Sequence, residues 1–345
     1  MMKHLLRFLP VLVILLAIPF TSAADPKAAA LDDLRVVRSG FMHDSLFGLT
    51  FNGLHGIAVG DHGVLLESRD GGETWVADET LDVEQALLSV TTAGEHVLVV
   101  GQEGIILTRE GNGPWQAQES GTAERILSAA MSDDGLAIAA GGFGTLLRSN
   151  DFGTTWESLL LSWEEYIDDP GYEPHLYDVE INPEGHILLA GEFGLILISR
   201  DGGDSWEQRN ASDESIFGMT VIGNGHGLAV GQNGYVLRTV DGGENWSQVE
   251  IPSNANLLDA WLSDDGAAVT VGIRALLSSG DGGQSWTLSE SPAVTRAWYT
   301  TLESSEVKKT NDTTTGETRV FMAGLLGMIV EVSPRQPGSS DGENP

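Results

Sequence analysis

The side chains of this sequence that could do chemistry are mainly carboxylates, and five aspartates recur in one motif. Each is followed by a Gly two residues later, then by a short polar residue and by Trp. The five pairs are Asp70 with Trp75, Asp151 with Trp156, Asp201 with Trp206, Asp241 with Trp246, and Asp281 with Trp286. A sixth copy keeps Trp115 but has Glu110 in place of the Asp. Acids repeated in this way could form a ring of calcium ligands or catalytic groups.

The local sequence favours a structural role for these aspartates. An Asp side chain in a turn accepts hydrogen bonds from backbone N–H groups one or two residues further on, and Gly adopts positive φ without steric cost. The Trp that follows can cover the turn and fill the space beside it. Because aspartates in separate turns face away from one another, we interpret the motif as a folding signal and predict no metal site.

Other catalytic arrangements are incomplete in this sequence. A glycosidase needs two carboxylates about 5 to 9.5 Å apart, and the many acids, among them Asp61, Glu103 and Glu192, offer no way to choose a pair. No Ser-His-Asp order, phosphate-binding loop or cofactor motif is present. His62 and His175 have no third ligand at the spacing of a zinc site. These observations predict a protein that is not an enzyme and binds no cofactor.

The spacing of the tryptophans shows how the elements around the motif are repeated. Successive Trp residues are 40, 41, 50, 40 and 40 residues apart, a period typical of propellers and solenoids. One repeat, residues 46–79, reads as four short apolar runs separated by Gly-rich turns, which predicts a four-stranded antiparallel meander. Such a sheet buries its two faces only when similar sheets are arranged around it.

Two further features of the repeat each occur seven times, one more than the Trp motif. The first-strand segments are residues 46–51, 86–91, 126–131, 176–181, 216–222, 257–262 and 297–302. The turns that follow the second strands are residues 60–63, 101–104, 141–144, 191–194, 231–234, 272–275 and 324–327. The predicted fold class is therefore all-β, a seven-bladed β-propeller of four-stranded antiparallel blades over residues 25–333.

The seventh repeat is short of one strand. It ends at Val332 without an Asp motif or a fourth strand, and residues 34–38 form an alternating strand candidate with no blade of its own. We therefore predict that the N-terminal strand completes the seventh blade beside residues 328–332 and closes the ring, which would remove two exposed sheet edges.

Charge and the two ends of the chain limit the possible partners and compartment. The formal net charge is −32, and there is no cysteine. This charge argues against nucleic acid or anionic lipid as a partner. Residues 1–24 have the charged start, apolar run and small residues of a signal peptide, and no cysteine could carry a lipid anchor. We expect a periplasmic or secreted chain, with residues 334–345 as a disordered tail.

A partner is expected to dock on one face of the propeller. The turns after the second strands share this face with the segments that enter the first strands. An insertion at residues 162–174 mixes aromatic and acidic residues there. The predicted partner-binding residues are Asp61, His62, Gln102, Glu103, Phe143, Glu192, Phe193, Trp163, Tyr166 and Tyr172. Exposed aromatic rings beside polar groups favour a protein contact; the alternative is that the rings pack down as ordinary loop residues.

The repeat resembles that of bacterial neuraminidase repeat, or Asp-box, propellers. It is most similar to the photosystem II assembly and stability factor family and its relatives in non-photosynthetic bacteria. Residues 229–246 read Ala-Val-Gly-Gln-Asn-Gly-Tyr-Val-Leu-Arg-Thr-Val-Asp-Gly-Gly-Glu-Asn-Trp, and the resemblance extends over residues 40–332. It implies a non-enzymatic scaffold for membrane protein assembly. The acidic charge and missing cysteine depart from the basic patch and lipid anchor of photosynthetic members.

Two functional hypotheses follow from the resemblance. The first is a periplasmic accessory or assembly factor for a membrane protein complex, with a transporter of the resistance-nodulation-division class as a candidate partner. The second is a glycan-binding or sialidase-like propeller, although the Phe-Arg-Ile-Pro signature of sialidases is absent. Its candidate substrate-binding arginines are Arg125, Arg274 and Arg296. Converging arginines or paired carboxylates at the channel mouth would favour the second hypothesis, and an exposed apolar patch would favour the first.

Overall fold

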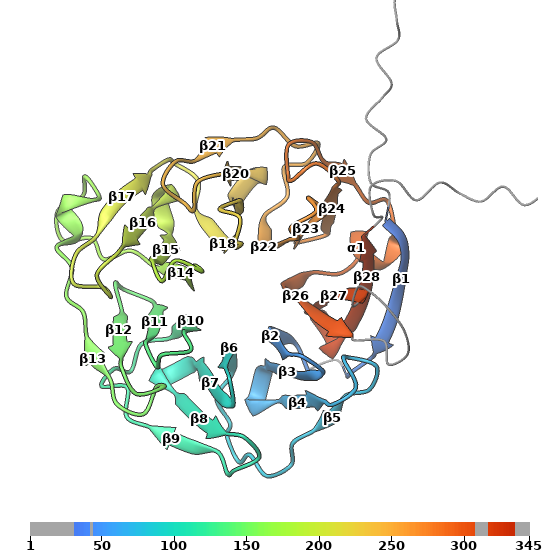
Figure 1. Cartoon of the computed structure of the whole chain (residues 1–345), viewed down its shortest axis with the longest axis horizontal. Coiled ribbons are helices and arrows are strands. Elements are labelled where there is room, and N and C mark those ends of the chain that lie inside the picture. Colours follow the sequence, from blue (N-terminus) through green and yellow to red (C-terminus); the bar gives the residue numbers. More distant parts are fainter. Residues whose placement is uncertain (1–30, 42–43, 308–316, 335–345) are drawn as a thin grey trace, which may run out of the picture.

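A ring of seven four-stranded antiparallel sheets surrounds a central channel in the computed structural model (Figure 1). The structure describes residues 31–41, 44–307 and 317–334. The seven-bladed propeller predicted from the repeats is confirmed. The predicted signal peptide, residues 1–24, and residues 335–345 of the predicted tail lie outside the described residues.

The first four blades follow one another along the chain. Blade 1 contains β2 (Leu46–Asn52), β3 (His55–Gly60), β4 (Leu65–Ser68) and β5 (Val76–Ala77). Blade 2 contains β6 (Leu87–Ala93), β7 (His96–Gly101), β8 (Ile106–Glu110) and β9 (Gln116–Gln118). Blade 3 contains β10 (Ile126–Met131), β11 (Ala137–Gly141), β12 (Leu146–Ser149) and β13 (Glu157–Ser158). Blade 4 contains β14 (Leu176–Ile181), β15 (Ile187–Gly191), β16 (Ile196–Ser199) and β17 (Glu207–Asn210).

The last three blades complete the circle. Blade 5 contains β18 (Ile216–Val221), β19 (Gly227–Gly231), β20 (Val236–Thr239) and β21 (Ser247–Gln248). Blade 6 contains β22 (Leu257–Leu262), β23 (Ala268–Gly272), β24 (Ala275–Ser279) and β25 (Thr287–Leu288). Blade 7 contains β26 (Tyr299–Val307), β27 (Glu317–Gly324), β28 (Ile329–Pro334) and β1 (Leu31–Arg38).

Strand β1 closes the ring from the opposite end of the chain. It pairs antiparallel with β28, with Leu34 opposite Val332, and lies at the outer edge of blade 7 (Figure 1). The Arg35 Nε–H donates to the Glu331 carboxylate across this pair at 2.7 Å. The predicted completion of blade 7 by the N-terminal strand is confirmed.

The apolar core is divided into seven clusters, each between two neighbouring blades. Between blades 5 and 6, for example, Leu228 and Val230 pack with Leu257, Leu277 and Trp286. The second strand of each blade is buried on both of its faces, so its sequence is a continuous apolar run rather than an alternation. Each fully buried Val or Leu contributes about 1.5–3 kcal/mol, so the blades depend on their neighbours for stability.

Each Asp box closes the turn between a third and a fourth strand. In blade 6, Asp281 Oδ1 accepts the Ser285 backbone N–H at 2.9 Å, and Oδ2 accepts the Ser285 hydroxyl at 2.6 Å. The Trp286 indole N–H donates to the Gly283 carbonyl at 3.0 Å. The same pattern recurs at Asp70, Asp151, Asp201 and Asp241. The carboxylate therefore accepts hydrogen bonds from the residue four positions further along the chain, because the turn wraps around it. The sequence had led us to expect donors only one or two positions further along.

The second Gly of the box lets the turn approach the preceding blade closely. Gly283 has φ +80°, and a Cβ there would lie 2.6 Å from a Leu228 methyl of blade 5. A side chain would therefore be both strained and in collision.

Blade 2 replaces its missing Asp box with an ion pair. Trp115 Nε1–H donates instead to Asp78 at the end of blade 1, at 2.9 Å. The Arg109 guanidinium lies 4.2 Å from the centre of the Trp115 ring and bonds Glu67 of blade 1. A cation–π contact and a salt bridge therefore hold this turn.

The two ends of the ring carry different turns. At one end the Asp boxes meet the turns between first and second strands, as where the Gly71 N–H donates to the Leu54 carbonyl at 2.9 Å. The other end carries the seven turns between second and third strands, and we call it the turn face. Short helical turns on it are η1 (Asp61–Gly63), η2 (Gln102–Gly104), η4 (Glu192–Gly194), η5 (Gln232–Gly234) and η6 (Leu325–Gly327).

Two other short helical segments lie between blades, η3 (Trp163–Glu165) and α1 (Pro292–Thr295). Within residues 31–41, 44–307 and 317–334, no helix has the length and apolar character needed to cross a membrane.

Candidate protein-docking face and channel

Main-chain hydrogen bonds join the two kinds of loop on the turn face. In all seven blades, the N–H of the first turn residue donates to the carbonyl of the residue that precedes the first strand, as from Asp61 to Ser45 at 2.8 Å. The second turn residue has φ between +51° and +61° in every blade. These residues are His62, Glu103, Phe143, Phe193, Asn233, Arg274 and Leu326. A positive φ is uncommon in non-Gly residues and is often found at binding sites, so these turn tips are held in a fixed, unusual conformation.

Aromatic side chains run from two turn tips toward the channel. The Phe143 ring lies 4.8 Å from His175, His175 lies 6.2 Å from Tyr177, and Tyr177 lies 5.0 Å from Phe217. A second contact joins Phe193 to Tyr172 at 5.3 Å. We call these six residues the aromatic path. Phe143 and Phe193 are 58% and 40% exposed, so the path begins at solvent-facing rings on blades 3 and 4.

Glu192 fixes the geometry of the aromatic path. Its Oε2 accepts the Tyr172 hydroxyl at 2.7 Å and the His175 backbone N–H at 2.9 Å. The bond to the carboxylate, together with burial, raises the pKa of Tyr172 to about 12, which keeps its hydroxyl as a donor. Glu192 is thus bonded to two members of the path.

The insertion at residues 162–174 is only partly available for contact. Trp163 is 7% exposed and belongs to the cluster between blades 3 and 4. A Cβ on Gly144 would collide with its indole. The Tyr166 hydroxyl donates to the Trp206 carbonyl at 3.4 Å, toward the outer part of blade 4. Of the three predicted aromatic residues in the insertion, Tyr172 alone joins the aromatic path.

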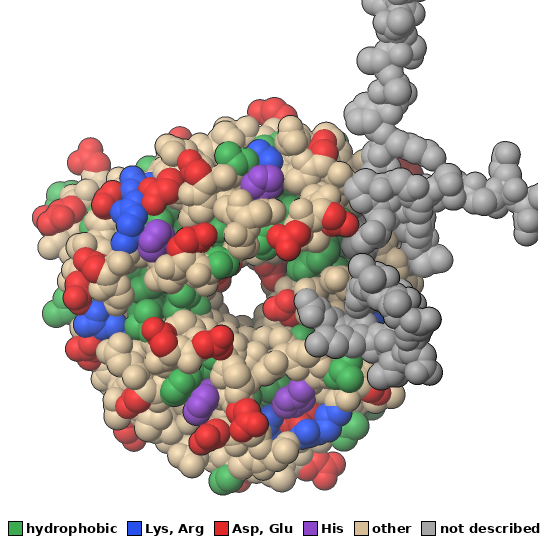
Figure 2. Space-filling model, in the orientation of Figure 1, with side chains coloured by type: hydrophobic (Ala, Val, Ile, Leu, Met, Phe, Trp, Pro, Cys, Tyr) green, Lys and Arg blue, Asp and Glu red, His purple; other side chains and the backbone are tan. Residues whose placement is uncertain are grey.

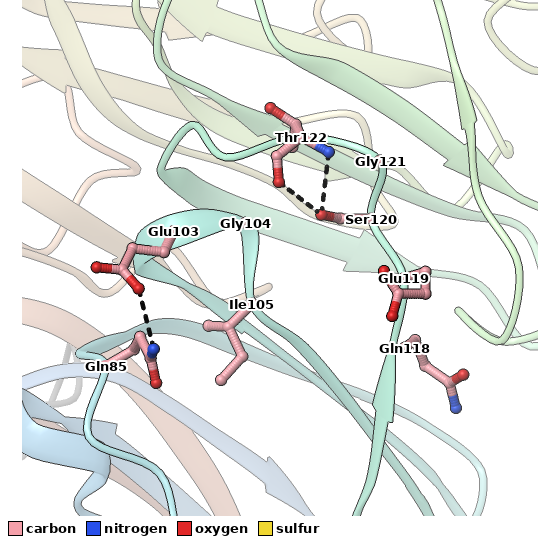
Figure 3. A pocket seen from close by; sticks show the side chains of 9 residues that line it. All are labelled: Gln85, Glu103, Gly104, Ile105, Gln118, Glu119, Ser120, Gly121 and Thr122. Atoms are coloured by element: carbon pink, nitrogen blue, oxygen red, sulfur yellow. Dashed lines mark hydrogen bonds between the residues drawn. The ribbon is translucent and has the colours of Figure 1, made fainter.

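The predicted polar residues lie on the neighbouring blades 1 and 2. The His62 backbone N–H donates to the Asp61 carboxylate at 3.0 Å. The Gln85 amide donates to Glu103 at 3.0 Å beside a pocket of about 380 Å³, whose opposite side holds Ser120 (Figure 3). The remaining predicted residue, Gln102, lies next to Glu103 in η2 and accepts the Ala86 backbone N–H at 3.4 Å. The turn face therefore has an aromatic sector on blades 3 and 4 and a polar sector on blades 1 and 2.

A ring of mostly apolar residues lines the channel near the turn face. Each inner strand has a register irregularity at its second residue, and irregularities of this kind re-aim side chains. These residues line one central cavity of about 130 Å³, and we call them the mouth ring: Phe47, Leu88, Leu127, Tyr177, Phe217, Leu258 and Thr300. Tyr177 and Phe217 belong also to the aromatic path, so the path ends in the channel.

Four carboxyl groups lie in the wall of the channel, which is open in the space-filling view with acidic side chains at its edge (Figure 2). Asp178 and Asp259 line the same cavity as the mouth ring. Glu180 and Glu303 lie further along β14 and β26. We call these four residues the channel carboxyls. Burial raises the pKa of Asp178 to about 6 and that of Glu303 to about 7. Burial and the neighbouring acids raise the pKa values of Glu180 and Asp259 further above normal.

Three channel carboxyls also connect neighbouring blades. Each accepts a backbone N–H from the inner strand of another blade. The bonds run from Met219 to Asp178 at 2.8 Å, from Val221 to Glu180 at 2.9 Å, and from Leu302 to Asp259 at 2.6 Å. These acids therefore have a structural role in holding the inner strands together.

The channel carboxyls and the inner half of the aromatic path were not among the predicted site residues. Asp178 and Glu180 alternate along β14, and such alternation indicates a shared face. That signal was present in the sequence, but it did not show which face of an inner strand meets the channel.

The three arginines considered for a sialidase site do not converge. Arg125 precedes blade 3, whereas Arg274 and Arg296 lie near the junction of blades 6 and 7, across the ring. His62 and His175 belong to blades 1 and 4. In the part of the chain that the structure describes, no three acidic or His side chains are placed to hold a metal ion. The channel does bring carboxyls together, which was one feature expected of a glycan-cleaving site.

Comparison with known proteins identifies relatives of this propeller. A family model described as photosynthesis system II assembly factor YCF48 matches residues 39–120 and 157–317. Photosystem II assembly lipoprotein Ycf48 of Synechococcus sp. (strain CC9902) is 24% identical over 139 residues, which are 37% of this chain and 40% of that protein. The match thus spans less than half the length of this curated relative.

Solved structures show the same fold. A structure of YCF48 bound to a D1 peptide has 21% identity and a TM-score of 0.66 over 89% of this chain and 98% of that chain. YCF48 from Cyanidioschyzon merolae has 19% identity and a TM-score of 0.65 over 88% and 99% of the two chains. The WD40 repeats of RRP9 align equally well, with a TM-score of 0.66 at 12% identity over 90% and 99%. Because the family model matches most of the propeller, the chain belongs to the photosynthesis system II assembly factor YCF48 family.

Proposed function

We propose that the protein is a non-enzymatic scaffold that assists a membrane protein complex and docks on it through the aromatic path. The observation that carries this proposal is the pair of exposed rings, Phe143 and Phe193, on fixed turn tips. A connected group of aromatic side chains on a rigid surface is typical of the centre of a protein interface. The family to which the chain belongs is described as an assembly factor, which supports the same role.

We place the scaffold in the periplasm, with a transporter of the resistance-nodulation-division class as the candidate partner. The support comes from the predicted signal peptide and from the absence of a cysteine that could carry lipid. The net charge of −32 departs from the basic surface expected of photosynthetic members. Because a related propeller binds a D1 peptide, we expect the ligand to be a peptide segment of a membrane subunit.

The test is crosslinking of the tagged protein to membranes, followed by purification and mass spectrometry. Wild-type protein should capture the subunits of one integral membrane complex. Phe143→Ser with Phe193→Ser should lose most of this capture, because both exposed rings are removed. The matched control is Val76→Ser with Leu288→Ser, which removes two exposed apolar side chains from the outer strands β5 and β25. Equal capture by the two double variants would contradict docking through the aromatic path.

The channel carboxyls are the observation that favours a glycan-cleaving role. Their bonds to backbone N–H groups give them a structural role instead. We expect no turnover of sialoside or other glycoside substrates and no binding on a glycan array. Hydrolysis that is lost in Glu180→Gln would overturn the non-enzymatic assignment.

A further inference from the structure

The channel mouth combines an apolar entrance with acidic walls. The mouth ring and the carboxyls of Asp178 and Asp259 line one cavity of about 130 Å³. This is well above the ~10–15 Å³ that one water molecule needs, so the cavity can take up an aliphatic stem with a polar end. The aromatic path enters the same cavity through Tyr177 and Phe217.

The acidic charge in this channel lies on inner strands that carry no cation of their own. None of the seven inner strands, all within the described residues, contains a Lys, Arg or His. Glu180 Oε2 is buried and has no hydrogen-bond partner. Buried carboxylates without a partner are costly. No group of three acidic or His ligands is placed for a metal ion among the residues described.

We propose that the channel mouth binds the side chain of a lysine or arginine carried by a peptide segment of the partner. This inference rests on the docking function proposed above. The methylene groups of the side chain would contact Phe47, Tyr177 and Phe217, and its charged end would reach Asp178 and Asp259. Long basic side chains bury their stems in this way and form strong charge-assisted bonds at their ends. Apolar residues next to the basic residue would lie on the aromatic path.

Binding of a cation must be linked to release of protons. The titratable groups that line the cavity are Asp178, Asp259 and the Tyr177 phenol. Glu180 and Glu303 lie further along the channel, and the His175 ring stacks against Tyr177. Burial raises the pKa of Tyr177 above its ordinary value, so it stays neutral. The channel carboxyls have raised pKa values, so they keep their protons at pH values at which an ordinary carboxyl is ionised. A bound ammonium or guanidinium favours their ionised form, so affinity should increase between pH 5 and pH 8.

The experiment uses a fluorescein-labelled peptide, Gly-Ser-Leu-Lys-Leu-Ser-Gly amide, and a matched peptide with norleucine in place of Lys. Norleucine keeps the aliphatic stem and removes the charge. Fluorescence anisotropy with the intact propeller at pH 8 and low salt should show that the Lys peptide binds about tenfold more tightly, a difference of ~1.4 kcal/mol. The preference should decline at pH 5 for the Lys peptide only.

Variants of the propeller locate the binding site. Asp178→Asn with Asp259→Asn should bind both peptides alike, and each Asn keeps an oxygen that can accept the backbone N–H. Glu180→Gln with Glu303→Gln changes two carboxyls deeper in the channel and should reduce the preference for the Lys peptide about threefold. This second double variant provides the test if the first one does not fold. The matched control is Glu84→Gln with Glu124→Gln, two exposed acids that precede β6 and β10 on the same face outside the channel, which should keep the full preference.

Two results would overturn the inference. One is equal affinity, or no binding, for the Lys and norleucine peptides; the other is an equal loss in the control variant. If capture of a membrane complex still depends on Phe143 and Phe193, the docking function stands while the channel inference fails. If the Lys preference is present but that capture is absent, the docking function fails and the channel binds basic segments from another source.

Discussion

Aspartate occurs in two opposite environments in this ring. Asp281 accepts four hydrogen bonds, from Ser279, Gln284 and Ser285. Burial pushes its pKa up, but these bonds outweigh it and hold the pKa below the ordinary value. Asp259 accepts two backbone N–H groups in a channel whose inner strands carry no cation, and burial raises its pKa. The balance between burial and hydrogen-bond donors, rather than the residue type, decides whether the ionised form is stabilised.

Removal of an Asp-box carboxylate should destabilise the propeller. We expect Asp281→Ala to lower the free energy of unfolding by about 1–3 kcal/mol, because hydrogen bonds to a charged group are lost. Urea denaturation at pH 7 measures this change. The difference should shrink as the pH falls below about 4, since the low pKa of Asp281 gives stability that is lost on protonation. Glu290→Ala, an exposed acid in the same blade, should change stability by less than ~0.5 kcal/mol.

Neutralisation of a channel carboxyl should have the reverse effect. The folded-state pKa of Glu303, about 7, lies above its unfolded value of about 4.3. The folded state therefore holds a proton that the unfolded chain releases, and stability is lost as the pH rises between these values. Glu303→Gln keeps an acceptor for the Ser304 N–H and should be more stable than wild type at pH 8 by about 1–3 kcal/mol. Urea midpoints at pH 4.5 and 8 test this.

The pH dependence separates titration from packing. At pH 4.5 the two proteins should differ by only ~0.5 kcal/mol, because the carboxyl is neutral in the folded state and only about half ionised in the unfolded chain. A constant difference at both pH values would contradict the raised pKa. Glu290→Gln again provides the exposed control.

Among the strands, β1 has a distinctive place because it comes from the other end of the chain. Without it, β28 would present unpaired backbone groups at the edge of blade 7, and such edges pair with other chains. Leu34 and Val37 of β1 pack against two different clusters, one beside blade 6 and one beside blade 1. The strand therefore contributes to both contacts of blade 7 with its neighbours.

Deletion of residues 31–38 should open this edge. We expect a loss of about 2–4 kcal/mol from the two partly buried apolar side chains, and self-association that increases with protein concentration. Urea denaturation and analytical ultracentrifugation measure the two effects. A synthetic peptide of residues 31–38 added in trans should restore the monomer, whereas the same peptide with Leu34→Asp should not. A stable monomer without β1 would contradict this role of the strand.

Across the whole molecule, the excess of acids acts against the compact state. The net charge of −32 produces repulsion over distances that salt shortens, from a Debye length of ~30 Å at 0.01 M to ~8 Å at 0.15 M. Several arginines offset it locally, as where Arg319 bonds Glu331 at 2.7 Å. Added salt weakens these ion pairs, which lowers stability. It also weakens the general repulsion between acids, which raises stability.

We expect the repulsion to be the larger of these two effects. The thermal midpoint should therefore rise by about 2 °C when NaCl is increased from 0.01 to 0.15 M at pH 8. Such a rise corresponds to a gain of ~1 kcal/mol in the free energy of unfolding. Differential scanning calorimetry gives the midpoint. Near pH 4, where carboxylates begin to be protonated, the rise should be smaller. A fall with salt at pH 8 would show that the ion pairs outweigh the repulsion.

The sequence predicted the ring but not the interior of its site. Seven copies of the turn after the second strand were visible without any contact information, and the short seventh repeat showed where β1 must pair. Trp163 illustrates the limit, because its acidic neighbours suggest exposure while its burial depends on the space left by Gly144, distant in sequence. The channel carboxyls lie on strands in which a register irregularity changes which side chains alternate toward the channel. That shift depends on pairing between strands.

The pairing of Leu31 with Pro334 also sets an order of events during synthesis. At ~5–20 residues per second, the last strand follows the first by roughly 15–60 s. During that time β1 has no partner, while blades 1 to 6 can already form from neighbouring segments. The ring is therefore the last feature to form, and a chain that stops before β28 is an open arc, because β1 is already made but has no strand of blade 7 to pair with.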